Sequence, residues 1–309
     1  MRRVFLTEGG IETSLIFQAG MELPEFASFP LLETDEGRDA LRDWSEQFLA
    51  LADETGLPFV LDTVTWRANP DWGMKLGYPL ERLAEVNREA VRFARDVAAG
   101  RPAVTVSGTI GPRRDGYVVE ERMTAAEAEV YHGWQVALLA ETGVDRITAM
   151  TLTYPDEATG IVRACAAAEI PVIPGFTVET DGRLPSGDSL AEAVEQVDRA
   201  SDRAAAFFMI NCAHPAHFSD AVRAGGAWVQ RIGGVRANAS KLSHAELDES
   251  EGLHSSDPAE LAQEHRALRS HMPALELVGG CCGTDVSHVR AIADALKIAR
   301  TGPRASGQT

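Results

Sequence analysis

The sequence predicts an α/β protein built as a single (β/α)8 barrel, and three observations lead to this fold class. Short apolar runs rich in β-branched residues recur along the 309 residues, and segments with helical spacing separate them. No shift in composition marks a domain boundary, so we expect one barrel over residues 1–300 and a flexible Gly/Ser/Pro-rich tail over residues 301–309. An open doubly wound sheet is the alternative that the same alternation allows.

The predicted strands follow one another at intervals that leave room for a helix between each pair. Each is a run of apolar residues, as a strand buried on both faces of a parallel sheet requires. In chain order the strands are Val4–Leu6, Phe59–Leu61, Ala103–Val106, Arg146–Ala149, Val172–Ile173, Phe207–Ile210, Trp228–Ile232 and Leu275–Val278.

The intervening segments carry apolar residues at steps of three and four, which indicates helices that bury one face. Segments 41–55 and 80–99 follow this pattern throughout. Segments 28–38 and 69–79 do not, and we expect them to be long loops, which is where a barrel carries its working residues. A further helix is predicted to bury the face that carries Val130, Trp134 and Leu138.

Composition and charge exclude several classes of function. The 29 Lys and Arg residues against 46 Asp and Glu residues give a net charge of −17, which argues against binding duplex nucleic acid or an anionic membrane surface. No run reaches the length of about 18 apolar residues that a membrane span needs, and the N-terminus has no apolar leader. We therefore expect a cytoplasmic protein that acts on small molecules, with its oligomeric state left open.

Cysteines at two predicted strand ends are the strongest chemical signal. Cys281 and Cys282 lie in the segment Val278–Asp285, which reads VGGCCGTD, and Cys212 ends the strand in the segment Phe207–Pro215, which reads FFMINCAHP. Because the carboxyl ends of all barrel strands open onto one mouth, these thiols can converge. Three thiolates suit Zn²⁺, which accepts tetrahedral sulfur ligation and keeps a fourth position open in catalytic sites.

Other interpretations of the cysteines and their neighbours remain open at this point. Cys281 and Cys282 can also be core residues, or can serve a cysteine hydrolase or redox enzyme. We expect Cys165 to pack within an alanine-rich helix, and His214 to face solvent or the following helix rather than a metal.

These motifs resemble those of the homocysteine S-methyltransferase family, and the resemblance extends across nearly the whole chain. The cysteine motifs are the most specific, and weaker motifs occur in the family's order. The weaker ones are Glu8-Gly9-Gly10, Asp62-Thr63-Val64-Thr65-Trp66, Ser107-Gly108-Thr109-Ile110-Gly111-Pro112 and Asn238. The resemblance implies a zinc-dependent barrel that methylates a thiol such as homocysteine and so forms methionine.

The resemblance also implies roles for individual residues, with no catalytic group beyond the metal site. The zinc ligands would be Cys212, Cys281 and Cys282, and the residues that bind the acceptor thiol would be Glu8, Gly9, Thr63, Met150 and Asn238. Two of these depart from the family: Glu8 stands for its usual Asp, and Met150 for a Glu that holds the amino group of the acceptor. The second departure leaves two alternatives, a methyltransferase for a different thiol or a non-catalytic zinc-binding barrel.

The methyl donor is expected to be cationic, because its leaving group must depart as a neutral molecule when the thiolate attacks. Sulfonium and quaternary ammonium compounds meet this condition, and aromatic side chains can hold them. We expect Trp66 and Tyr154 to do so, with Trp72 as a further candidate. The short C-terminal region is similar to the branch of the family that uses S-methylmethionine.

Overall fold

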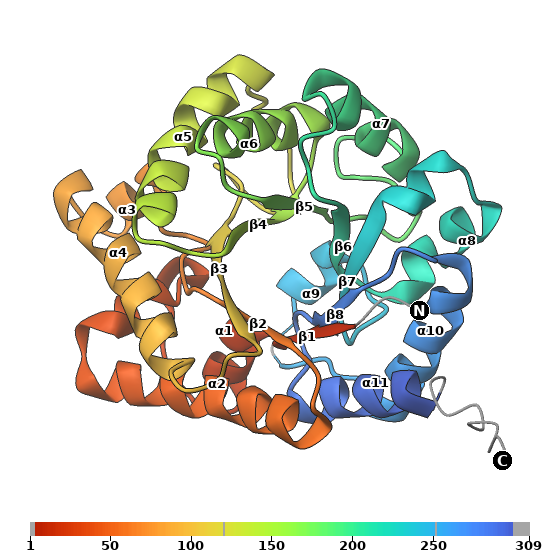
Figure 1. Ribbon diagram of the computed structural model, residues 1–309, viewed down its shortest axis with the longest axis horizontal. Helices are drawn as coiled ribbons and strands as arrows, with labels where there is room; N and C mark the ends of the chain where they lie inside the picture. The colour runs from red at the N-terminus through yellow and green to blue at the C-terminus, as the bar shows by residue number, and fades with distance from the viewer. Residues whose placement is uncertain (1–3, 120, 251, 299–309) are drawn as a thin grey trace, which may run out of the picture.

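The computed structural model describes residues 4–119, 121–250 and 252–298, and these form a closed barrel of parallel strands ringed by helices (Figure 1). Neighbouring strands pair in the order β1-β2-β3-β4-β5-β6-β7-β8, and β1 also pairs with β8 to close the barrel. The predicted fold class is therefore correct, and the open-sheet alternative is excluded. The predicted tail over residues 301–309 lies outside the described residues.

The barrel strands are β1 (Phe5–Thr7), β2 (Phe59–Asp62), β3 (Val104–Ile110), β4 (Arg146–Leu152), β5 (Val172–Phe176), β6 (Phe208–Ala213), β7 (Ile232–Ala237) and β8 (Leu277–Gly280). The α-helices are α1 (Ile11–Phe17), α2 (Asp35–Thr55), α3 (Pro70–Lys75), α4 (Leu80–Val97), α5 (Ala125–Glu141), α6 (Pro155–Ala167), α7 (Leu190–Ala200), α8 (Pro215–Ala224), α9 (His244–Asp248), α10 (Pro258–His271) and α11 (Val286–Ile298). Three short 3-10 helices complete the set: η1 (Pro24–Phe26), η2 (Phe29–Glu33) and η3 (Ala227–Arg231).

Two apolar layers hold the barrel together. The larger lies between the sheet and the helices, as Figure 1 shows from their arrangement, and includes Cys165, which is fully buried as expected. The second is a small cluster that contains Met150 and a few other apolar residues, one from each of five strands. Within the described residues no helix is long and apolar enough to cross a membrane.

The prediction for the seventh strand is wrong. The predicted run Trp228–Ile232 is mostly the 3-10 helix η3, and β7 begins where that run ends. The real strand contains Gly233 and Gly234, which give it no apolar pattern. A Cβ at Gly233 would lie 2.5 Å from the ring of Phe207, and one at Gly234 would lie 3.0 Å from Met209, so close packing against β6 requires glycine there.

The predicted buried face of α5 is also wrong in part, because Val130 is exposed. The helix instead buries the polar residues His132 and Gln135. His132 Nε2 lies 2.9 Å from Glu157 Oε1, and Gln135 Nε2 donates to the carbonyl of Thr65. Buried polar groups with such partners are tolerated in a core, and an apolar pattern cannot reveal them.

The two predicted long loops contain helical structure. Segment 28–38 holds η2 and the start of α2, whose N-cap residue Thr34 accepts a hydrogen bond from the backbone of Gly37. Segment 69–79 holds α3, which begins at the N-cap residue Asn69. Each helix is introduced by a side chain that satisfies a free backbone N–H group, a local signal that apolar spacing does not contain.

Candidate active site

Three thiols gather at the carboxyl ends of β6 and β8. The sulfur atoms of Cys212, Cys281 and Cys282 all lie within 4.8 Å of one another, and Cys212 Sγ is 3.5 Å from Cys282 Sγ. Tetrahedral zinc has Zn–S distances of about 2.3 Å, which separates bound sulfur atoms by about 3.8 Å. The cluster therefore has the ligand type and the spacing that zinc requires. His214, by contrast, is buried against α8 and α10, where its Nδ1 accepts from the backbone of Ala216.

The sharing of protons within the cluster follows from this proximity. Hydrogen bonds from Cys212 and Cys282 hold the pKa of Cys281 well below its ordinary value. The same contacts, together with burial, raise the pKa values of the other two thiols. These contacts therefore favour the thiolate form at Cys281 over the other two cysteines, and a bound cation would favour it at all three.

The backbone that presents Cys212 leaves regular strand geometry. Cys212 has φ = 54°, and the pairing of β6 with β7 is irregular between Asn211 and Ala213. Thr151 on β4 has φ = 63°, and the pairing of β4 with β5 shifts at the same level. Left-handed backbone at non-glycine residues is costly and concentrates at functional sites, while bulges re-aim side chains. The left-handed residues and the shifts in strand pairing together change the direction of the backbone where β4 and β6 end at the barrel mouth.

Three side chains converge on the carbonyl oxygen of Cys212. Thr177 Oγ1 donates to it at 3.2 Å, Asn238 Nδ2 at 3.1 Å and His244 Nε2 at 2.7 Å. The other ring nitrogen of His244 lies 2.8 Å from Glu179 Oε1. Burial opposes the charge of His244, but its hydrogen bonds to Glu179 and to Cys212 raise its pKa. This network fixes the orientation of Cys212, and it gives Asn238 a contact with the cysteine backbone.

Tyr117, which the sequence interpretation missed, also contacts the cluster. Its hydroxyl lies 2.9 Å from Cys212 Sγ, and its ring stacks on His244 with centroids 4.1 Å apart. Burial and the neighbouring thiols raise the pKa of Tyr117 well above its ordinary value, so the phenol stays protonated. It lies in the loop between β3 and α5, where nothing in the local sequence distinguishes it from other loop aromatics.

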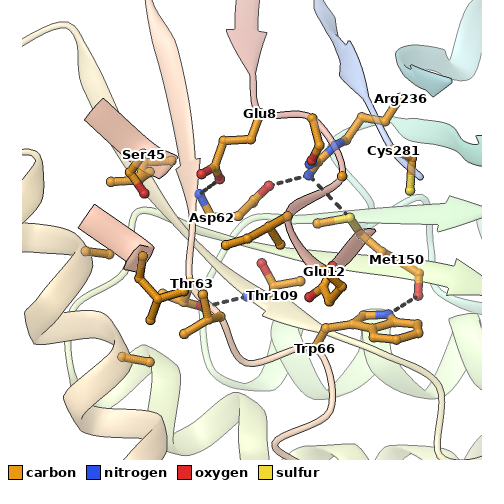
Figure 2. Close-up of a pocket in the computed structure, with 18 of the residues that line it drawn as sticks. Glu8, Glu12, Ser45, Asp62, Thr63, Trp66, Thr109, Met150, Arg236 and Cys281 are labelled. Atoms are coloured by element: carbon orange, nitrogen blue, oxygen red, sulfur yellow. Dashed lines mark hydrogen bonds and ion pairs between the residues drawn. The ribbon is translucent and has the colours of Figure 1, made fainter. Parts of the chain in front are cut away.

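A cavity of about 80 Å³, the inner cavity, is lined by the three thiols. Figure 2 shows Glu8, Asp62, Glu12, Arg236 and Met150 directed into it from different elements. Arg236 on β7 forms an ion pair with Asp62 on β2, and its Nη1 lies 3.3 Å from Met150 Sδ. The strand-4 position that carries Met150 therefore faces a guanidinium group.

The carboxyl groups that line this inner cavity have too few cations nearby to offset the effect of burial on their pKa values. Burial, together with the charge of Asp62, raises the pKa of Glu8 to about 8. Burial raises the pKa of Glu12 to about 7, although Ser28 donates to its Oε1. Asp62 Oδ1 and Thr109 Oγ1 are buried without a hydrogen-bond partner among the described residues. The cavity is thus prepared for a cationic ligand that can donate hydrogen bonds.

The other residues predicted to bind the acceptor have structural neighbours as well. Gly9 lines the cavity, and a Cβ there would lie 2.6 Å from the carbonyl oxygen of Thr284, so the β1 turn packs tightly on the loop after β8. The hydroxyl of Thr63 lies 2.6 Å from that of Thr65 and accepts from the backbone N–H of Thr109. Thr63 therefore connects β2 to β3 at the cavity wall.

A second, outer chamber of about 490 Å³ has Cys282 in its lining. It shares Phe26, Trp66, Tyr117 and Cys282 with the inner cavity. Cys282 therefore borders both spaces, while Cys212 and Cys281 line the inner cavity alone. Each space thus has a sulfur atom of the cluster in its wall.

The aromatic residues predicted to hold the donor do not form a cage. Trp66 lines both spaces, but the guanidinium carbon of Arg67 lies 4.2 Å from the centroid of its ring. The same carbon lies 3.7 Å from the ring of Trp72. Tyr154 is buried at the N-terminus of α6, where its hydroxyl accepts from the backbone of Met123, and it is not among the residues that line either space.

Two of the missed residues carry a signal in the sequence. Arg236 is a charged residue two positions after the glycine pair of β7, and Glu12 follows Glu8 by four residues at the start of α1.

Comparison with known proteins decides what kind of protein this site belongs to. Residues 5–296 match the sequence profile of the family described as homocysteine S-methyltransferase. The chain belongs to the homocysteine S-methyltransferase family. It is accordingly a methyltransferase.

Solved structures agree with this assignment at the level of the fold. The crystal structure of the homocysteine methyltransferase MmuM from Escherichia coli in its oxidised form superposes with a TM-score of 0.75 at 20% identity, covering 97% of each chain. The metallated form gives a TM-score of 0.72 at 18% identity, covering 95% of this chain and 96% of that one. No curated protein matches the chain. At these identities the structural likeness shows the shared barrel fold.

Proposed function

We propose that this member of the homocysteine S-methyltransferase family transfers a methyl group from a cationic donor to the thiol of homocysteine, with Zn²⁺ held by Cys212, Cys281 and Cys282. The observation that carries the proposal is the convergence of these three thiols in the lining of the inner cavity, which shares Cys282 with the outer chamber. Zinc held by three thiolates lowers the pKa of a fourth, entering thiol, so that the acceptor is a thiolate at neutral pH.

The protein's own side chains hold the cluster in place. The donors on the carbonyl of Cys212 fix that strand end, and the hydroxyl of Tyr117 contacts its sulfur. Supporting hydrogen bonds of this kind tune metal affinity and ligand orientation. Asn238 is therefore proposed to position Cys212.

The inner cavity favours an acceptor that carries an ammonium group. Glu8 and Glu12 both face it, and each lacks a cationic partner within 4.0 Å among the described residues. We propose that these two carboxylates bind the amino group of homocysteine. They would thereby take over the role of the family's strand-4 carboxylate, which Met150 cannot perform. The free Oδ1 of Asp62 offers a further acceptor. Zwitterionic homocysteine thus fits the site although strand 4 has no carboxylate.

The outer chamber is proposed to hold the donor. In the transfer step a carbon–sulfur bond forms between the methyl carbon and the acceptor thiolate. The bond from the methyl carbon to the donor's sulfonium or ammonium centre breaks, and its electron pair stays on that centre, which leaves neutral. The acceptor's thiol proton is released when the thiol enters, so no further general base is required.

A different thiol acceptor remains the second candidate, because Met150 and Arg236 reshape the cavity wall. The deciding experiment pairs S-methylmethionine with homocysteine or with 4-mercaptobutanoate, which lacks the amino group, and follows products by mass spectrometry. Preference for homocysteine supports the proposal, and equal or better turnover of 4-mercaptobutanoate favours the second candidate. Absence of transfer to any thiol would restore the non-catalytic zinc-binding interpretation.

The metal assignment has its own test. Purified protein should contain about one zinc per chain, and Cys282→Ala should lose most of it. Cys165→Ala is the matched control, because Cys165 is buried in α6 away from the cluster. Equal zinc in the two variants would contradict the proposed ligand set and would favour a redox or hydrolytic role for the cysteines.

A further inference from the structure

We propose that Arg67 is an anion-binding residue of the outer chamber and that it holds the carboxylate of the methyl donor. The inference rests on the proposed function for the identity of the ligand. It narrows the donor class from any sulfonium or quaternary ammonium compound to one that also carries a carboxylate.

The first observation is that Arg67 is a buried cation without a counter-ion. The residue is 6% exposed, and among the described residues it forms no ion pair with a carboxylate. Its single recorded hydrogen bond runs from Nη1 to the carbonyl of Arg114 at 3.1 Å, and its buried Nε has no partner among the described residues. A buried guanidinium normally has a carboxylate partner, since an unpaired one carries a large desolvation cost.

The second observation is the setting of this guanidinium. Its central carbon lies 4.2 Å from the centroid of the Trp66 ring and 3.7 Å from the centroid of the Trp72 ring. A guanidinium that packs on aromatic rings keeps the N–H donors at its edge for a hydrogen-bonded ligand. A planar guanidinium edge matches a carboxylate in a two-point hydrogen-bonded pair. The surroundings therefore prepare Arg67 for an anion of this shape.

Two of the other charged residues that line the chamber have partners of their own, although the charge of Asp115 also favours the charged form of Arg67. Lys75 pairs with Glu25 at 2.6 Å, and Asp115 Oδ1 accepts from the backbone of Tyr117 and Val118. Burial lowers the pKa of Arg67 to about 10, which still leaves it charged at neutral pH. Arg67 is thus the lining cation of this chamber whose charge a ligand can neutralise.

The position of Arg67 connects this anion site to the thiols. Trp66, on which Arg67 stacks, lines both spaces, and Cys282 lines them as well. A donor whose carboxylate pairs with Arg67 lies in the chamber that Cys282 borders. Its cationic methyl centre cannot occupy the indole faces that Arg67 contacts, so an anion anchor replaces the expected aromatic cage.

The test compares two ligands that differ in one charge. S-methylmethionine and its carboxamide share size and sulfonium centre, but only the first has a carboxylate. We expect wild-type protein to bind the acid about 10- to 100-fold more tightly than the amide, as a charge-assisted hydrogen-bonded pair implies. Calorimetry without acceptor measures this directly, and the KM of each donor in the complete reaction provides a second readout.

Variants at position 67 identify the residue responsible. Arg67→Met should lower affinity for the acid to that for the amide and leave the amide unchanged, while Arg67→Lys should retain part of the preference. Arg290→Met is the matched control, because the Arg290 side chain on α11 is exposed, pairs with Glu54 and lines neither space. Thermal unfolding and zinc content should be the same in all variants that are compared.

Equal binding of acid and amide to the wild-type protein would overturn the inference without any variant. An unchanged preference in Arg67→Met would overturn it as well. Methyl transfer that is indifferent to the carboxylate would reject the anion site but keep the proposed function. Carboxylate-dependent binding through Arg67 without transfer to any thiol would keep the anion site but reject the proposed function.

Discussion

Asn211 on β6 holds Thr151 on β4 by two hydrogen bonds across the barrel mouth. Its Oδ1 accepts from the backbone N–H of Thr151 at 2.9 Å, and its Nδ2 donates to the Thr151 hydroxyl at 3.0 Å. Thr151 is one of the two strand-end residues with left-handed backbone, and Cys212, directly after Asn211, is the other. One amide thus connects the irregular end of β4 to the backbone that presents a cluster thiol.

Asn211→Ala should therefore loosen both strand ends. The variant leaves the buried N–H of Thr151 without a partner, which costs about 1–3 kcal/mol of the free energy of unfolding. Zinc affinity should fall as well, because Cys212 is no longer held in its orientation. Denaturant unfolding and competition with a chromophoric chelator measure the two effects. Gln196→Ala, which removes a surface amide bonded to Asp156, is the control. Unchanged zinc affinity in Asn211→Ala would refute the coupling.

His244→Ala tests the support of Cys212 from outside the strand. The imidazole donates to the Cys212 carbonyl and stacks on Tyr117. Loss of such a supporting group lowers metal affinity by about 10- to 100-fold. His271→Ala, at the exposed end of α10, should have no effect on zinc binding measured in the same competition assay. Equal affinities for the two variants would exclude the positioning role.

Glu12→Gln tests the proposed recognition of the acceptor's amino group. We expect the KM for homocysteine to rise about 10- to 100-fold, because a charged hydrogen bond is lost. The KM for 4-mercaptobutanoate should not change. Adding Met150→Glu to Glu12→Gln should restore part of the affinity, since a carboxylate then faces the cavity from strand 4. Glu22→Gln on the surface is the control. An equal loss for both thiols would assign Glu12 a structural role.

The same carboxylates predict how stability depends on pH. The folded pKa of Glu12 is raised from 4.5 to about 7, and that of Glu8 from 4.5 to about 8. The folded state holds these protons more tightly than the unfolded state. The contribution of the two groups to the free energy of unfolding is therefore complete below pH 4.5 and is lost as the pH rises through their folded pKa values of about 7 and 8. Without acceptor, urea midpoints should decline over this window, and less steeply in Glu12→Gln. A midpoint that rises across the window would contradict the assignment.

Arg236→Met tests the ion pair at the cavity wall. It leaves Asp62 buried and unpaired, which should cost about 3–5 kcal/mol of the free energy of unfolding. The double variant Asp62→Asn with Arg236→Met should recover much of this loss. Lys241→Met, which breaks an exposed pair with Glu260, should leave the free energy of unfolding nearly unchanged, because solvent screens exposed pairs. Denaturant unfolding of wild type, Asp62→Asn, Arg236→Met and the double variant completes the cycle, and additive losses would show that the pair is not coupled.

Apolar periodicity predicted most of the barrel, but it missed elements whose pattern depends on neighbours. The runs at Phe59 and Arg146 begin strands where expected, since these strands are buried on both sides. β7 was misplaced because its glycines, Gly233 and Gly234, make room for Phe207 just before β6 and for Met209 within β6. The buried face of α5 was misread because His132 finds its partner, Glu157, on the next helix.

The sequence by itself determined the barrel, the family and the three cysteines at strand ends, because strand alternation and a fixed order of motifs are local properties of the chain. The tertiary structure alone decided that Glu12 faces the inner cavity, that Arg236 lies beside Met150, and that Arg67 contacts two indole rings. A charged group acquires its role from burial and from the charges around it in space. Those neighbours come from distant parts of the chain, so spacing along the sequence does not reveal them.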